Sequence, residues 1–104
     1  MDRKKLEELR RRRLAGLRGT QPKARVLQSL AKQLGRKEVN RGKEPTYESE
    51  TFPQLRPLSI PNHKGRDIPT GTTKSVLDQM EEDIDSWDES LPKQEQGNGS
   101  ANSD

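Results

Sequence analysis

Leucines near the N-terminus recur at helical spacing. At roughly 100° per residue they fall within one stripe, and they are Leu6, Leu9, Leu14 and Leu17. Strong helix formers surround them, Asp2 stands near the start, and Gly16 and Gly19 are stop signals. The pattern predicts a helix from about Asp2 to Leu17.

A second helix is predicted within TQPKARVLQSLAKQLG, which runs from Thr20 to Gly35. Thr20 suits the N-cap, Pro22 the first turn, and Gly35 the left-handed position after the C-terminus. One face of this helix is apolar and consists of Val26, Leu27, Leu30, Ala31 and Leu34. Two short stripes are too little to hold a monomeric core. We therefore expect this face to dock on a partner or on a second copy of the chain.

The third helical pattern lies in SVLDQMEEDIDSWDESLP, between a capping Ser75 and Pro92. Its apolar residues have the spacing of a coiled-coil seam or of a helix laid in a groove; they are Leu77, Met80, Ile84, Trp87 and Leu91. The other face is almost wholly acidic, so the predicted partner offers an apolar groove with a basic rim. The alternative is intramolecular: the acidic helix pairs with the basic N-terminal helix, and Trp87 covers the leucine stripe.

Between the second and third helices, residues 36–75 are predicted to form a proline-rich, disordered linker. The prolines recur too often for a helix or a central strand, at Pro45, Pro53, Pro57, Pro61 and Pro69. An extended, partly polyproline-like chain is the expected conformation.

Within this linker the stretch FPQLRPLSI carries regularly spaced apolar residues, which are Phe52, Leu55, Leu58 and Ile60. Their spacing resembles the leucine-rich signal read by nuclear export receptors, and the embedded prolines resemble those in the export signal of lentiviral RNA-export regulators. The resemblance implies export from the nucleus through a groove that accepts these side chains. The alternative is a hydrophobic anchor that presses onto the helices.

Composition then argues against a packed core. Apolar residues make up 25% of the 104 residues and charged residues 36%, and the mean hydropathy is -1.26. This apolar surface is too small to offset the ordering of the backbone. The predicted fold class is mostly disordered with short α-helices, two basic and N-terminal and one acidic, amphipathic and C-terminal, with no globular core. The predicted regions are a basic helical region (1–35), the linker (36–75), the acidic helix (76–92) and a disordered polar tail (93–104).

Charge is strongly separated along the chain. Residues 1–44 hold 15 Lys and Arg against 5 Asp and Glu, whereas residues 76–104 hold 1 against 9. Polyanion binding is one interpretation of the basic end, because each arginine presents a planar fork of donors to phosphate oxygens. The alternative is a solvated helix that carries a run of charges. The candidate nucleic-acid or anion-binding residues are Arg10, Arg11, Arg12, Arg13 and Arg18.

Several classes of function are not expected. The chain has no cysteine and a single histidine, His63, so neither a metal site nor a cofactor is predicted. Its carboxylates lie in no recognisable catalytic pattern, and no enzymatic activity is predicted. No secretory signal or membrane-spanning window is found, which favours the nucleus or the cytoplasm, or both, and excludes a membrane partner.

Two functions of different class fit these patterns. We expect first a non-enzymatic adaptor or assembly subunit that docks protein partners through the apolar residues of its three helices. Its acidic segment IDSWDESL is similar to the tryptophan-acidic cargo motifs bound by kinesin light chains. The alternative is an arginine-rich RNA- or DNA-binding protein that shuttles between nucleus and cytoplasm.

Overall fold

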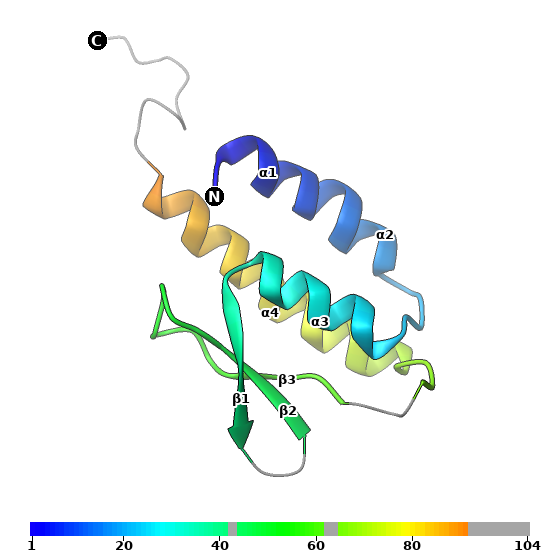
Figure 1. The fold of residues 1–104 in the computed structure, drawn as a ribbon. Helices are drawn as coiled ribbons and strands as arrows, with labels where there is room; N and C mark the ends of the chain where they lie inside the picture. Colours follow the sequence, from blue (N-terminus) through cyan, green and yellow to red (C-terminus); the bar gives the residue numbers. More distant parts are fainter. Residues whose placement is uncertain (42–43, 62–64, 92–104) are drawn as a thin grey trace, which may run out of the picture.

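Helices come first along the chain, a small sheet follows, and one long helix comes last in the computed structural model, which describes residues 1–41, 44–61 and 65–91 (Figure 1). In order, the elements are α1 (Arg3–Glu8), η1 (Leu9–Leu14), α2 (Ala15–Leu17), α3 (Ala24–Gln33), β1 (Arg36–Arg41), β2 (Glu44–Ser49), β3 (Leu58–Ser59) and α4 (Thr70–Ser90). The predicted polar tail, residues 93–104, lies outside the described residues.

The first three helical elements follow one another without a break and cover the range predicted for the first helix. Asp2 caps this helix, because its side chain accepts a hydrogen bond from the Lys5 amide at 2.8 Å. The helix ends where Arg18 becomes extended and Gly19 takes a φ of +79°. Thr20, which was predicted to cap the next helix, instead donates its hydroxyl to the Leu17 carbonyl at 2.7 Å.

The middle of this helix, η1, is a π-helix, and the leucine spacing explains why. Leu9 and Leu14 are both buried, yet they are five residues apart. In an α-helix five residues advance roughly 140° beyond a full turn, which would point one of the two leucines to solvent. The wider π turn, marked by the Ala15 amide donating to the Arg10 carbonyl, brings Leu14 back to the buried face.

Deleting Arg12 tests this explanation. The deletion shortens the spacing between Leu9 and Leu14 to four residues, which an ordinary α-helix places on one face. The free energy of unfolding, measured by urea denaturation, should therefore change by less than about 1 kcal/mol. Deleting Gln28 from α3 is the control, because it rotates the leucines that follow off the buried face and should cost several times more. Equal losses would show that η1 does not absorb a surplus residue.

The second helix, α3, begins later than predicted, at Ala24, with an extended Lys23 before it. Its C-terminal end agrees with the prediction, since Gly35 takes a φ of +92° just beyond the last turn.

The range 36–75, predicted to be a disordered linker, contains a three-stranded antiparallel sheet of order β1-β2-β3. In the β1–β2 pair Arg36 lies opposite Ser49 and Val39 opposite Thr46, and β3 adds a short pair with β2. The prolines do not prevent this arrangement. Pro45 is the second residue of β2, and its carbonyl accepts a hydrogen bond from the Ile60 amide at 3.2 Å.

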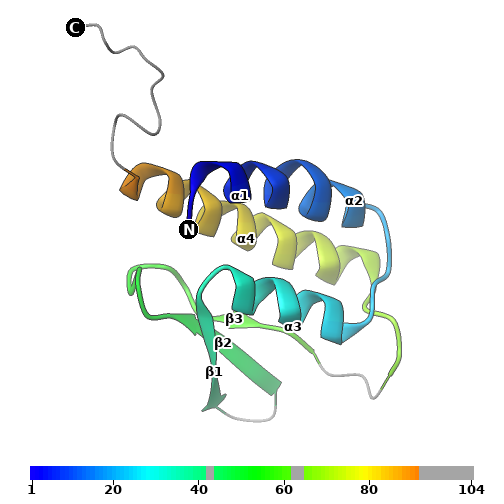
Figure 2. The same ribbon diagram turned by 45° about the horizontal axis from the view of Figure 1, so that its top comes forward.

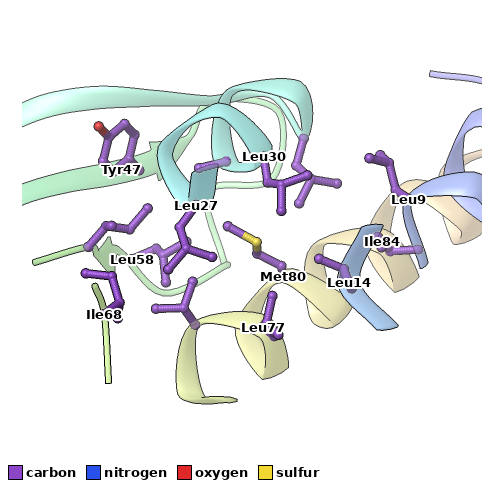
Figure 3. Close-up of a cluster of buried hydrophobic side chains, with 14 of the residues drawn as sticks. Leu9, Leu14, Leu27, Leu30, Tyr47, Leu58, Ile68, Leu77, Met80 and Ile84 are labelled. Atoms are coloured by element: carbon purple, nitrogen blue, oxygen red, sulfur yellow. The ribbon is translucent and has the colours of Figure 1, made fainter. Parts of the chain in front are cut away.

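Around α3 and α4 the elements form layers. The sheet lies on one side of these two helices, and the helix α1–η1–α2 lies on the other (Figures 1 and 2). Leucines of η1, α3 and α4 point toward one another in the centre, beside Met80 (Figure 3). The buried apolar side chains come from every layer, and they are Leu6, Leu9, Leu14, Ala24, Leu27, Leu30, Ala31, Leu34, Tyr47, Leu58, Ile60, Ile68, Val76, Leu77, Met80 and Ile84.

The prediction of a mostly disordered chain without a globular core is therefore wrong, and so is the description of the protein as intrinsically disordered. The average composition misled, because it counts the apolar residues without regard to their positions along the chain. The few apolar residues are spaced so that they meet in one cluster. No described helix combines the length and the apolar character that a membrane span requires.

Candidate functional site

A row of side-chain ion pairs, called the ladder below, joins the basic first helix to the acidic last helix. Arg3 lies 3.3 Å from Asp88, Arg10 contacts Asp85, and Arg18 reaches both Asp78 and Glu81 at 3.0 Å. These are the contacts of the intramolecular alternative considered above. All the side chains in the ladder are more than a third exposed, so solvent screens the pairs and each contributes little stability.

The ion pairs of the ladder also shift the pKa values of two of its members. Hydrogen bonds that Arg18 donates to Glu81 and Asp78 raise the pKa of its guanidinium group above the ordinary value. Hydrogen bonds from Lys74 and then Arg18 hold the pKa of Asp78 below its ordinary value. Both shifts keep the groups charged, so Arg18, a candidate anion-binding residue, is already neutralised within the protein.

Three of the four consecutive arginines are not used in this way. Arg11, Arg12 and Arg13 are exposed, and none has an ion-pair or hydrogen-bond partner among the described residues. The winding of η1 turns Arg10 toward α4 and leaves the next three on the solvent side. Of the candidate anion-binding residues, these three keep an unneutralised charge.

The outer surface of α3 is also basic. Arg25 and Lys32 are exposed without a partner in the described part of the chain, and they line a hollow together with Gln28, Ser29 and Gln33. The sequence contains no Asp or Glu between Leu9 and Lys37. A second hollow lies over α1 and is lined by Lys4, Glu7, Glu8, Arg11 and Arg12, so carboxylates offset part of its charge.

The side chains predicted to bind partners mostly form the core instead. The buried ones are Leu6, Leu9, Leu14, Leu27, Leu30, Leu34, Leu77, Met80 and Ile84. Leu17, Trp87 and Leu91 are partly buried against that core, and Val26 is partly buried. The coiled-coil seam of the third helix therefore packs inward, on the protein's own helices and sheet.

Trp87 does not cover the leucine stripe of the first helix. Its indole N–H donates to the Leu34 carbonyl at 2.7 Å, and its ring lies against Gly35 at the end of α3. The ring of Phe52 meets it edge to face, with centroids 4.9 Å apart. Trp87 thus joins α4, α3 and the loop before β3.

The stretch predicted as an export signal is folded into the same structure. Leu58 and Ile60 are fully buried, Phe52 packs on Trp87, and Leu55 is half-buried. These positions correspond to the hydrophobic anchor described as the alternative. To bind in the groove of an export receptor, this segment would first have to leave the core.

A buried ion pair was missed by the reasoning from sequence. Arg36 of β1 donates to both carboxylate oxygens of Asp83 in α4, at 2.6 and 2.8 Å, and both side chains are 1% exposed. The Nη1 group of Arg36 donates to the backbone carbonyls of Tyr47 and Arg56, at 2.8 and 2.9 Å. Burial raises the pKa of the Asp83 carboxyl, although the hydrogen bonds from Arg36 oppose the rise.

A signal for this pair was present in the sequence. Asp83 lies three residues after Met80 and four before Trp87, so helical spacing places it on the apolar seam rather than on the acidic face. A carboxylate in that position needs a buried cation, which only the tertiary fold identifies as Arg36.

Within the described residues, no group of three or more His, Cys, Asp or Glu side chains is arranged to hold a metal ion. Comparison with protein-family models, with curated proteins and with solved structures finds no match for this chain.

Proposed function

We propose that this protein binds nucleic acid through the phosphate backbone, with Arg11, Arg12 and Arg13 as the main contacts. One observation carries the proposal. The arginines that α4 reaches are paired with its carboxylates, whereas these three are exposed and have no partner among the described residues. Adjacent unneutralised guanidinium groups favour a polyanionic ligand.

The chemistry of the ligand is that of a chain of phosphates. A guanidinium group donates two parallel hydrogen bonds to phosphate oxygens, and each contact releases condensed counterions. This binding depends steeply on salt and needs no enzymatic step. RNA and DNA both offer the backbone that these arginines contact.

The adaptor function predicted first finds no support in the apolar helix faces. It required apolar helix faces that are free to enter a partner's groove, and those side chains occupy the protein's own core. The proposal therefore rests on the charged surface.

Replacing Arg11, Arg12 and Arg13 with Gln tests the proposal. Gln keeps the helix propensity, so the fold should remain, while binding to short labelled RNA and DNA weakens. In fluorescence anisotropy titrations the slope of log affinity against log salt should fall by about three, because each of the three arginines neutralises one phosphate.

The matched control removes three exposed charges elsewhere, with Lys37→Gln, Arg56→Gln and Lys74→Gln. This control has the same net charge as the arginine variant, but its slope of log affinity against log salt should stay near that of the wild type. If the two variants bind equally, the arginine tract is not the site. If the wild type binds neither nucleic acid, the proposal is wrong.

A further inference from the structure

The outer face of α3 is a second basic surface, separate in sequence from the arginine tract. It carries Arg25 and Lys32, exposed and without a partner among the described residues, and no carboxylate lines its hollow. Figures 1 and 2 show α3 running antiparallel to the helix α1–η1–α2. Two antiparallel helices thus each present basic side chains to solvent.

Neutral donors lie between these charges. Gln28 and Ser29 line the same hollow, and the Gln33 amide donates to the Ser29 hydroxyl at 3.3 Å. Side chains of this kind commonly contact phosphate and sugar oxygens, which position a protein on a duplex without reading its sequence.

The aromatic side chains that single-strand recognition uses are occupied. The chain has one Tyr, one Phe and one Trp. Tyr47 is 1% exposed, and Phe52 and Trp87 pack on each other edge to face. Proteins that bind single strands stack successive bases on exposed aromatic rings. The described surface also has no large exposed hydrophobic side chain on which a base could lie.

From these observations we infer that the ligand is a double-stranded nucleic acid, held by its backbone between η1 and α3, with Arg25 and Lys32 as the second anchor. The inference rests on the proposed function and specifies its ligand. A duplex presents two rows of phosphates at a fixed separation, so two charged helices contact it together. A flexible single strand gains less from that arrangement and finds no ring to stack on.

The test compares a labelled duplex with one of its single strands, as RNA and as DNA, at the same salt concentrations. The wild type should bind at least one of the duplexes more tightly than either single strand. A difference between the RNA and DNA duplexes then identifies which backbone the surface fits. Binding to a single strand that is equal or tighter, and still sensitive to Arg11, Arg12 and Arg13, would overturn the inference and leave the proposed function standing.

The second anchor is tested with Arg25→Gln/Lys32→Gln. On the duplex, this variant should lower the salt slope by about two, since each phosphate contact contributes about 0.9. Arg56→Gln/Lys74→Gln removes the same charge from other surfaces and should leave the slope near that of the wild type. Circular dichroism melts check that both variants fold, as expected for exposed side chains. Equal slopes in the two variants would exclude α3 from the interface.

Discussion

Replacing Arg36 with Met should lower the free energy of unfolding by about 3–5 kcal/mol, because it leaves the buried Asp83 carboxylate without its cation. The carbonyls of Tyr47 and Arg56 would lose their donor as well. Chemical denaturation followed by circular dichroism measures the loss. Lys37→Met is the control, since Lys37 forms an exposed pair with Glu50 and should matter little.

A double variant separates the contribution of the ion pair from the cost of burying a single unpaired charge. In Arg36→Met/Asp83→Leu neither charge remains, so the protein should be more stable than with Arg36→Met alone. Two losses that simply add would show that the groups do not interact.

The pH dependence of stability gives a second measurement on the Arg36→Met variant. Burial already raises the pKa of Asp83, and loss of the guanidinium group removes the hydrogen bonds that oppose the rise. The folded Arg36→Met variant then binds a proton more readily than its unfolded chain does. Its deficit relative to the wild type should therefore shrink as the pH falls through the folded-state pKa of Asp83.

Trp87→Ala should cost about 3 kcal/mol, at the low end for an aromatic truncation because the ring is only partly buried. The change leaves the Leu34 carbonyl without the indole donor, removes the edge-to-face packing with Phe52 and uncovers Gly35. Urea denaturation followed by circular dichroism measures the loss.

Trp87→Phe is the informative companion, since it keeps an aromatic ring and loses the hydrogen bond to Leu34. It should fall between the wild type and Trp87→Ala. In the wild type, emission from the sole tryptophan should shift to the red on unfolding. A Trp87→Ala variant as stable as the wild type would show that the ring is free to dock on a partner, as the helical pattern alone predicts.

The helices were predictable because their signals are local. Leucine spacing and the acidic Asp2 near the start predict the first helix, and Gly35 marks the end of the second. The start of α4 was placed too late because Gly71, Thr72 and Thr73 are poor helix formers. Thr73 is nevertheless fully buried, so packing compensates for its propensity.

The sheet was not predictable in this way, because its strands lack alternating apolar residues. β1 reads RKEVNR and β2 reads EPTYES, with one large apolar side chain each. Contacts from distant residues hold the strands in place, namely the pairing of Arg36 with Asp83 and the burial of Tyr47. For the same reason, the sequence located the arginine tract but not which of its members α4 would neutralise.

The position of α4 at the end of the described chain also has a consequence for the order of folding. Its contacts reach back 47 residues to Arg36, 53 to Leu34 and 85 to Arg3. Such non-local contacts slow folding, because long loops must close before the contacts form. During synthesis, the earlier helices and strands emerge from the ribosome before α4. Their leucines stay uncovered and their arginines unpaired until α4 has been synthesised. Closure of the core therefore follows the synthesis of α4 and comes after the earlier helices and strands have formed.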